Sequence, residues 1–353
     1  MLNISEVLTI AKNSGASDVH LTVGIPPKMR VNGELLNMEF DKLLPPDTQA
    51  IADSIMNETQ KARLIEKGEV DMSFSIPEVG RYRLNVYHQR GSIAMAFRLV
   101  GTKVPSPDVL GIPSSVVDLS QRKRGLVLVT GPTGSGKSTT LASIIDNINQ
   151  TRDAHVITLE DPIEYLHSHQ MSMVNQREIG IDSQSYAGAL RAALREDPDV
   201  ILVGEMRDFE TISVAITAAE TGHLVLSTLH TIGAASTVDR IIDVFPPDQQ
   251  QQIRVQLSNV LEAVISQQLI PTKDGKGRVA AFEVMHANYA VRNLIREGKS
   301  HQLMSVIQTN AKMGMMTMDD AIMNLYYCNR IGFDEAVEFA QDVEGMKLKL
   351  NNM

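Results

Sequence analysis

The sequence has little cysteine and no long apolar run. Its 353 residues include a single cysteine, Cys328, which excludes an internal disulfide and a cysteine-based metal site. We expect Cys328 to be a small buried apolar residue in a protein of a reducing compartment. No stretch reaches the ~18–20 apolar residues of a membrane span, and residues 1–21 lack the basic start and apolar centre of a signal peptide. These absences predict a cytoplasmic protein whose membrane contacts are peripheral.

The sequence also lacks an excess of basic residues. Its 33 Lys and Arg residues face 42 Asp and Glu residues, which gives a formal net charge of −9. Such a chain has no general attraction to phosphodiester backbones, on which nucleic-acid binding depends. We therefore expect no nucleic-acid partner.

The length and the distribution of turn signals predict two domains. Strand-like runs alternate with turn signals up to residue 99, which predicts a small mixed α+β domain over residues 1–104. Prolines and glycines without apolar periodicity indicate a linker at 105–115. Residues 116–353 are predicted to form an α/β domain with a helical C-terminal region. In this domain strand-like runs alternate with helical patterns, which is typical of a parallel sheet. The predicted strands are 126–130, 156–159, 200–203 and 224–227, and the predicted helices include 185–195 and 209–220. A further strand at 279–284 precedes helical patterns at 289–297 and 301–312.

A glycine-rich loop follows the first of these strands and precedes a helical pattern. It reads Gly131-Pro132-Thr133-Gly134-Ser135-Gly136-Lys137-Ser138-Thr139 and matches G-x-x-x-x-G-K-[ST]. Glycines let backbone N–H groups turn toward a polyphosphate, and the N-terminus of the next helix favours the same charge. We expect Lys137 to reach the terminal phosphates and Ser138 to hold Mg²⁺ through its hydroxyl. The flanking strand and helix favour a nucleotide site over an incidental glycine-rich turn.

Acidic and imidazole side chains follow the other parallel strands. Glu160, Asp161 and Glu164 come after 156–159, Glu205 after 200–203, and His230 after 224–227. Ligands of an open parallel sheet bind beyond the carboxyl ends of its strands, where these side chains are expected to converge. Hydrolysis of a phosphoanhydride needs Mg²⁺ and a group that orients the attacking water. The set therefore favours hydrolysis over helix capping or solvated surface charge.

The same argument separates similar residues. Asp197 and Asp199 precede their strand and are expected at the opposite edge from Glu205. His223 begins a strand that His230 follows, roughly 20 Å away if the strand is extended. We therefore expect His230 to detect the terminal phosphate; the alternative is that His230 is an imidazole of the core. His223 ranks below His230 for this role.

Arginines are the expected source of positive charge for the transition state. Arg81 and Arg83 share a strand face, and Arg90 and Arg98 lie in the same small domain. Arg191 and Arg195 share a helix face at i, i+4 spacing. For each of them a solvated surface charge is the alternative. If an arginine of the small domain reaches the phosphates, the nucleotide state sets the relative position of the two domains, as in a motor.

Together these motifs resemble the retraction ATPases of type IV pili, within the secretion ATPase superfamily. The resemblance spans nearly the whole chain and rests on five segments: the Walker A loop 131–139, an aspartate box at 157–164, a Walker B segment at 197–208, a histidine box at 221–231, and Ala290-Val-Arg-Asn-Leu-Ile-Arg-Glu297. The last segment differs from the AIRNLIRE sequence of retraction ATPases only by valine for isoleucine. As an amphipathic helix it would direct Val291, Leu294 and Ile295 inward and Arg292 and Arg296 outward.

The resemblance implies a PAS-like N-terminal domain, a RecA-like P-loop ATPase domain and a ring-shaped homohexamer that uses ATP and Mg²⁺. It assigns water activation and Mg²⁺ handling to Glu164 and Glu205, with the division between them open. It matches Arg83 and Arg98 with arginines of the small domain that approach the nucleotide, and Arg191 and Arg195 with the catalytic pair that precedes Walker B. Each could act in its own subunit or in a neighbour. It also implies an inner-membrane platform protein (PilC-like) as partner, a location at the inner face of the cytoplasmic membrane at the pilus base, and a PilU-like paralogue as a possible partner.

Three alternatives remain open at the sequence level. The chain could be an assembly or secretion ATPase of the same superfamily, although such proteins usually carry an extra N-terminal domain and a four-cysteine zinc motif. It could be a PilU-like accessory ATPase, against which the 290–297 segment is the main argument. It could be a non-catalytic nucleotide-dependent scaffold, against which the intact acidic set argues.

Overall fold

The chain forms two compact units in a computed structural model that describes residues 2–31, 33–77, 79–101 and 103–351. One unit contains the residues up to Lys103 together with Glu164–Leu166, and the other contains Val104–Ile163 and the residues from His167 onward. The segment 164–166 groups with the first unit because Tyr165 forms an isolated parallel bridge with Gly101.

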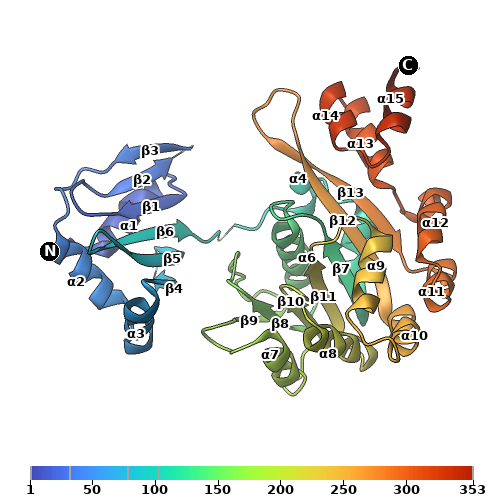
Figure 1. Cartoon of the computed structure of the whole chain (residues 1–353), viewed down its shortest axis with the longest axis horizontal. Helices are drawn as coiled ribbons and strands as arrows, with labels where there is room; N and C mark the ends of the chain where they lie inside the picture. The colour runs from blue at the N-terminus through green and yellow to red at the C-terminus, as the bar shows by residue number, and fades with distance from the viewer. Residues whose placement is uncertain (1, 32, 78, 102, 352–353) are drawn as a thin grey trace. The chain divides into compact units, whose positions relative to one another are not determined.

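The N-terminal unit is an antiparallel six-stranded sheet with three helices (Figure 1). Along β5, Tyr82, Leu84 and Val86 are buried whereas Arg83 is exposed, the alternation expected of a sheet with one covered face. This is the small α+β domain that the strand-like runs and turn signals predicted. In chain order the elements are α1 (Ile4–Asn13), β1 (Asp18–Leu21), β2 (Lys28–Val31), β3 (Glu34–Asn37), α2 (Pro45–Ile55), α3 (Glu58–Lys67), β4 (Glu69–Ile76), β5 (Gly80–Gln89) and β6 (Ser92–Leu99), and the strand order is β3-β2-β1-β6-β5-β4.

The C-terminal unit is built on a seven-stranded sheet of order β13-β12-β7-β11-β10-β8-β9. All neighbouring strands are parallel except the β12–β13 hairpin. The predicted α/β class is confirmed, whereas β9 and β12 were missed from the sequence. The strands are β7 (Gly125–Thr130), β8 (His155–Glu160), β9 (Met173–Glu178), β10 (Val200–Val203), β11 (Leu224–Leu229), β12 (Leu261–Pro271) and β13 (Arg278–His286).

Helices cover both faces of this sheet (Figure 1). Leu126 and Leu128 of β7 pack into the core formed with α7 to α10, while Val127 and Val129 pack against α6. Successive residues of a strand point to opposite faces, so a fully apolar strand is what a sheet covered on both sides requires. The covering helices are α6 (Lys137–Thr151), α7 (Tyr186–Ala193), α8 (Phe209–Glu220), α9 (Ala234–Asp243) and α10 (Gln250–Val260).

The helices from residue 318 onward form a small separate core against the β12–β13 hairpin, whereas the two helices before them pack into the core with α7 to α10. Ile270 and Ala281 of the hairpin are buried with Met318, Ile322 and Met346. Cys328 is exposed at the end of α13, so the expectation of a buried cysteine is wrong. The predicted helix at 301–312 is shorter, because only α12 is an α-helix there. The helices are α11 (Tyr289–Arg296), α12 (Leu303–Thr309), α13 (Met318–Tyr327), α14 (Phe333–Glu338) and α15 (Val343–Asn351).

The segment predicted as a linker, 105–115, contains regular structure. It includes α4 (Pro107–Leu110) and the start of α5 (Ser114–Val117), and Ile112 is buried in the core beside α6. Within the described part of the chain, no helix is both long and apolar enough to cross a membrane.

Candidate functional site

The glycine-rich loop connects β7 to α6, with Lys137 as the first residue of the helix. Gly131 and Gly136 have φ angles of +142° and +89°, a region that favours glycine. A Cβ atom at Gly131 would collide with the Gln267 carbonyl oxygen, and one at Gly136 would lie 2.9 Å from Gln267 Nε2. Gln267, on β12, is 3% exposed and was not singled out from the sequence. The loop therefore needs glycine at both positions because β12 packs directly against it.

Lys137 is held inside this loop. Its Nζ donates hydrogen bonds of 2.9 Å to the carbonyl oxygens of both Gly131 and Pro132. Burial lowers the pKa of Lys137, and the negative charge of Glu205 opposes that shift. The Ser135 hydroxyl is 3% exposed and has no hydrogen-bond partner among the described residues. A buried ammonium group beside an unpaired hydroxyl donor fits an anionic ligand such as a polyphosphate.

The strand order places the predicted polar residues at one edge of the sheet. β11 lies between β7 and β10, and β8 follows β10, all in parallel register. The glycine-rich loop, His230 and Glu205 therefore follow the carboxyl ends of three successive strands, and Glu160 is the last residue of the fourth. These positions therefore share the edge of the sheet at which ligands of open parallel sheets bind.

Glu205 is the centre of an ion-pair cluster at this edge. Its Oε1 lies 2.8 Å from His230 Nε2, and its Oε2 lies 2.7 Å from Arg207 Nη2. The Glu205 side chain is 16% exposed, whereas those of His230 and Arg207 are 44% and 75% exposed. Arg207 is part of the Walker B segment but was not predicted as a site residue, although its position two residues after Glu205 was a usable signal.

The acidic residues at and after the end of β8 do not all lie where the sequence predicted. Glu160 accepts hydrogen bonds from Thr158 Oγ1 (2.6 Å) and Gln176 Nε2 (3.1 Å), so its carboxylate joins β8 to β9. Glu164 is exposed and belongs to the segment that groups with the N-terminal unit. The structure therefore places Glu164 in a different unit from Glu205.

Two residues that the strand-edge argument ranked lower do lie at the opposite edge. Asp199 Oδ2 accepts a hydrogen bond of 2.8 Å from the His155 N–H at the start of β8. The His223 Nδ1 atom lies 2.9 Å from the Ala218 carbonyl oxygen, before the start of β11. Both therefore have local structural partners.

Four of the candidate arginines, Arg83, Arg98, Arg191 and Arg195, have exposed side chains, and their contacts differ. Arg83 and Arg98 face each other across β5 and β6, and Arg98 Nε pairs with Asp18 Oδ1 at 2.8 Å. Arg191 pairs with Glu210 at 2.6 Å, and Arg195 donates a hydrogen bond to the Arg191 carbonyl oxygen.

A hollow of about 210 Å³ lies beside the start of α6. Gly136, Thr139 and Thr140 form one wall, and Leu269 and Val279 of the hairpin form another. Arg278 and Arg330 also line it, and neither was predicted from the sequence. The hollow combines apolar walls with two cations and is continuous with residues of the glycine-rich loop.

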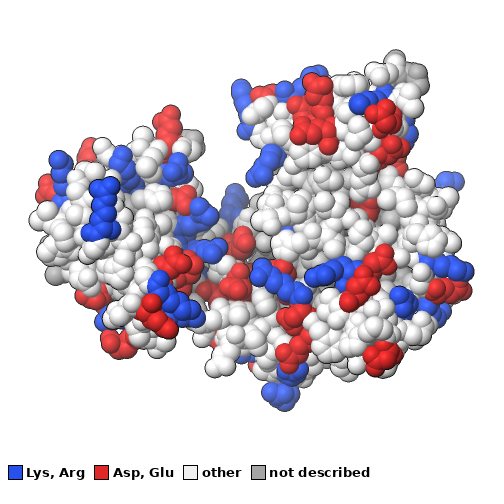
Figure 2. All heavy atoms as spheres, viewed as in Figure 1, with Lys and Arg blue, Asp and Glu red and all other residues white. Residues whose placement is uncertain are grey.

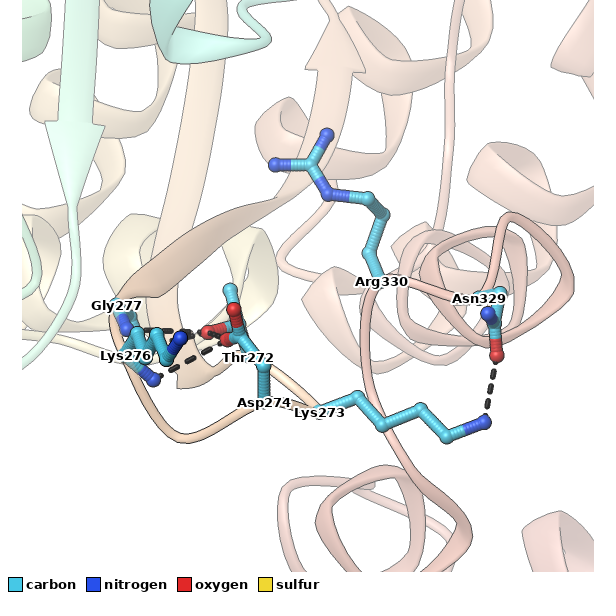
Figure 3. A pocket seen from close by; sticks show the side chains of 7 residues that line it. All are labelled: Thr272, Lys273, Asp274, Lys276, Gly277, Asn329 and Arg330. Atoms are coloured by element: carbon cyan, nitrogen blue, oxygen red, sulfur yellow. Dashed lines mark hydrogen bonds between the residues drawn. The ribbon is translucent and has the colours of Figure 1, made fainter.

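A second hollow, of about 610 Å³, surrounds the turn of the β12–β13 hairpin (Figure 3). There Lys273 Nζ donates a hydrogen bond of 2.6 Å to Asn329 Oδ1, which ties the turn to the end of α13. In Figure 3 the Arg330 side chain extends away from this bond. Arg330 lines both hollows, so it connects the region beside α6 with the C-terminal helices.

The 290–297 segment forms α11, and one part of its prediction is wrong. Val291 and Ile295 are buried and Arg296 is exposed, as expected. Arg292, however, is only partly exposed, with 23% of its side chain accessible. Its guanidinium donates to the carbonyl oxygens of Ala287, Ser258 and Asn259, each at 2.8 Å, and to Glu262 Oε1 at 2.9 Å. The residue is instead a clamp that satisfies the free carbonyl groups at the end of α10.

Comparisons with known proteins identify the family of the chain. Residues 114–325 match the family described as type II/IV secretion system protein. The type IV pilus retraction ATPase PilT of Pseudomonas aeruginosa is 47% identical over 340 residues, 96% of this chain and 98% of that protein. The type IV pilus ATPase PilU of the same organism is 38% identical, over 99% of this chain and 91% of that protein.

The fold is also that of a solved member of this group. A crystal structure of the pilus retraction motor PilT with bound ADP superimposes with a TM-score of 0.91 at 50% identity, over the whole of both chains. Sequence, structure and family model thus agree with the resemblance read from the motifs. The chain therefore belongs to the PilT family of type IV pilus retraction ATPases, within the type II/IV secretion system proteins.

Proposed function

We propose that this chain is a Mg²⁺-dependent ATP hydrolase whose turnover powers the retraction of type IV pili. The observation that carries the hydrolase assignment is the grouping of Lys137, Glu205 and His230 at the carboxyl ends of adjacent parallel strands. The assignment to retraction rests on the 47% identity to a retraction ATPase over nearly the whole of both chains.

Nucleotide binding is assigned to the loop 131–139 and the hollow beside α6. In this proposal the Lys137 ammonium exchanges its two loop carbonyl partners for phosphate oxygens. The Ser135 hydroxyl and the first N–H groups of α6 supply further donors. The hollow of about 210 Å³ takes the base, with Leu269 and Val279 against its faces and Arg278 or Arg330 stacked on its ring.

Hydrolysis is assigned to the acidic edge. Glu205 orients the attacking water and accepts its proton, or divides these tasks with Glu164. His230, 2.8 Å from Glu205, donates a hydrogen bond to the terminal phosphate and so detects its presence. Mg²⁺, held by Ser138 and Glu205, would neutralise charge on the phosphates. No group of three potential metal-ligating side chains occurs among the described residues, which fits a cation bound mainly through the substrate phosphates and water.

Positive charge for the transition state is assigned to Arg83, Arg98, Arg191 and Arg195. The first two lie on the exposed face of the N-terminal sheet, Arg191 lies on α7, and Arg195 comes two residues after the end of that helix. Mixing subunits that carry Arg83→Ala with subunits that carry Lys137→Ala distinguishes their site of action. Recovery of turnover in the mixture indicates action on a neighbouring subunit, and its absence indicates action within one subunit.

Mechanical work is assigned to a ring-shaped homohexamer at the inner face of the cytoplasmic membrane. Its partners in this proposal are an inner-membrane platform protein (PilC-like) and the pilus machinery, with a PilU-like paralogue in some complexes. Retraction is preferred to the PilU-like role because the identity to PilT is 47% against 38% to PilU.

The proposal is tested with purified protein and with cells. Lys137→Ala and Glu205→Ala are expected to lower ATP turnover by at least about 100-fold, because each removes a group that acts on the transition state. Lys347→Ala and Glu344→Ala, at an exposed surface pair, are matched controls. Full turnover by the two site variants would contradict the ATPase assignment, and tight ATP binding without turnover by the wild type would favour a scaffold. Deletion is expected to leave piliated cells that cannot retract, whereas bald cells would favour an assembly ATPase.

A further inference from the structure

Two buried acceptors hold the backbone of the loop that carries His230. Residues 230–233 join β11 to α9. The Ser266 hydroxyl accepts a hydrogen bond of 3.0 Å from the Gly233 N–H, and Glu283 Oε1 accepts one of 2.7 Å from the Ala234 N–H. Both acceptor residues are 0% exposed. The loop is therefore fixed to the β12–β13 hairpin at two consecutive peptide groups.

The two acceptors are partners in one sheet. Ser266 on β12 and Glu283 on β13 are paired in the antiparallel register. Thr237 extends the contact into the loop, because its hydroxyl donates to the Gly233 carbonyl oxygen at 2.8 Å and lies 2.7 Å from the Thr231 hydroxyl. A continuous chain of hydrogen bonds thus runs from Glu283 to the residue that follows His230.

Burying Glu283 costs folding free energy that a purely structural contact would not require. Burial raises the pKa of its carboxyl group, and Oε2 is buried without a hydrogen-bond partner among the described residues. A buried acid with one unsatisfied oxygen destabilises a fold relative to a packed apolar side chain. Ala234 is the first residue of α9, so the carboxyl group also lies at the positive end of that helix.

The carboxyl group of Glu283 faces a second helix as well. Its neighbour Val284 exchanges backbone hydrogen bonds of 2.8 and 3.0 Å with Met316, just before α13 begins at Met318. The Met318 N–H makes no hydrogen bond to Oε2, but like the Ala234 N–H it lowers the pKa of Glu283 against the effect of burial. Glu283 therefore lies between the first turns of α9 and α13, and α13 belongs to the C-terminal core.

We propose that Glu283 is a positioning residue that sets His230 against Glu205 during hydrolysis and transmits movements of the 230–233 loop to the C-terminal helices α13–α15. This rests on the proposed function, since it requires His230 and Glu205 to act on the nucleotide. Ser266 supports the same loop from the neighbouring strand.

The first test separates positioning from binding in the full-length protein. Glu283→Leu is expected to lower kcat for ATP by about tenfold with KM within about twofold, because it disturbs an interaction used in the transition state. Glu283→Gln keeps an oxygen for the Ala234 N–H and is expected to restore most of kcat. Ser266→Ala is expected to reduce kcat by a smaller factor. Glu220→Leu, at an exposed glutamate of α8, is the matched control.

The second test measures the link to the C-terminal helices. Binding of a non-hydrolysable ATP analogue is expected to change amide hydrogen exchange over 318–327 in the wild type. Glu283→Leu is expected to bind the analogue without that change. If Glu283→Leu does not fold, the same exchange measurement is made on Ser266→Ala. The analogue is then expected to cause a smaller change in exchange over 318–327 than it causes in the wild type.

Three results would overturn the role of Glu283. These are wild-type kcat in a folded Glu283→Leu protein, an equal loss of kcat in Glu283→Gln and Glu283→Leu, and an undiminished exchange response in the variants. Absence of turnover in both the wild type and Glu220→Leu contradicts the proposed function itself, and with it the role of Glu283. If the wild type and Glu220→Leu both hydrolyse ATP, the results for the Glu283 variants alone decide the role of Glu283.

Discussion

At the scale of single residues, the site is defined by a few close contacts around Glu205 and Lys137. The carboxylate of Glu205 pairs with both His230 and Arg207, and its charge acts on Lys137. A substitution that removes the charge of Glu205 but keeps the shape of its side chain distinguishes its chemical role from its packing. Glu205 is therefore the residue whose substitution is most informative.

We expect Glu205→Gln to reduce kcat by a factor of about 10²–10³ while ATP still binds, because the amide cannot accept a proton from water. Single-turnover hydrolysis and equilibrium binding of a fluorescent ATP analogue measure the two effects. Glu344→Gln, whose pair with Lys347 is exposed, is the control. A loss of binding as large as the loss of turnover would show that Glu205 acts on the ground state instead.

Gly131 and Gly134 provide a matched pair for the backbone of the loop. Both have positive φ, at +142° and +79°, so alanine is strained at either by about 1–3 kcal/mol. A Cβ at Gly134 meets nothing within 4 Å, whereas one at Gly131 collides with the Gln267 carbonyl oxygen. Gly131→Ala is expected to lower the thermal unfolding temperature more than Gly134→Ala. Equal decreases in the unfolding temperature of the two variants, measured by calorimetry, would refute a close approach of β12 to the loop at Gly131.

Sequence reasoning found those site residues that stand beside a motif or follow an apolar strand. Lys137, Glu205 and His230 meet this condition, and topology alone brings them together. Gln267 and Glu283 do not, because each lies inside a strand and gains its role from a loop far away in the sequence. Arg292 was misread because helical periodicity separates buried from exposed faces but does not identify a backbone carbonyl group that an arginine can reach.

At the scale of elements, β12 explains most of what the sequence left unpredicted. The apolar residues Leu257, Val260, Leu261 and Val264 have helical spacing, so the pattern of α10 runs on into the strand without a break. The chain changes to a strand at Leu261 because it pairs with β7 on one side and β13 on the other. Tertiary pairing overrides local periodicity here.

The docking of α11 depends on its clamp to α10. Arg292→Ala is expected to destabilise the protein by about 2–3 kcal/mol, because it leaves the carbonyl groups of Ser258 and Asn259 without their donor. Arg296→Ala, at an exposed position of the same helix, is expected to change stability by less than about 0.5 kcal/mol. Urea unfolding of the two variants makes the comparison, and similar midpoints would contradict the clamp.

Glu283 gives the β12–β13 hairpin a pH dependence of known sign. Burial raises its pKa above the ordinary value of 4.5, so the folded state favours the protonated acid. That contribution is complete below pH 4.5 and is lost as the pH rises through the raised value. The stability of the wild type relative to Glu283→Gln is therefore expected to fall from pH 4.5 upward. Denaturant unfolding at several pH values measures it, and a constant difference would refute a raised pKa.

At the scale of the whole molecule, the charge balance and the proposed ring make separate predictions. Acidic and basic side chains are interspersed on the face shown in Figure 2. Light scattering after size exclusion is expected to give six times the 38.8 kDa chain mass when Mg²⁺ and an ATP analogue are present. A monomer at all concentrations would contradict the ring.

Nucleic-acid binding is expected to be absent at every ionic strength, since the net charge is −9. Titration of labelled single- and double-stranded DNA at low and high salt measures it. Binding that weakens steeply with added salt would identify a basic surface that the overall composition conceals.

The position of β7 between β11 and β12 also has a consequence for biosynthesis. The glycine-rich loop leaves the ribosome early, yet the strands that flank β7 are Leu224–Leu229 and Leu261–Pro271. A nascent chain that stops before Leu261 exposes one edge of β7 and lacks the Gln267 contact to Gly131. Partly synthesised chains are therefore expected to need chaperones, and to acquire nucleotide binding only after residue 271 has been added.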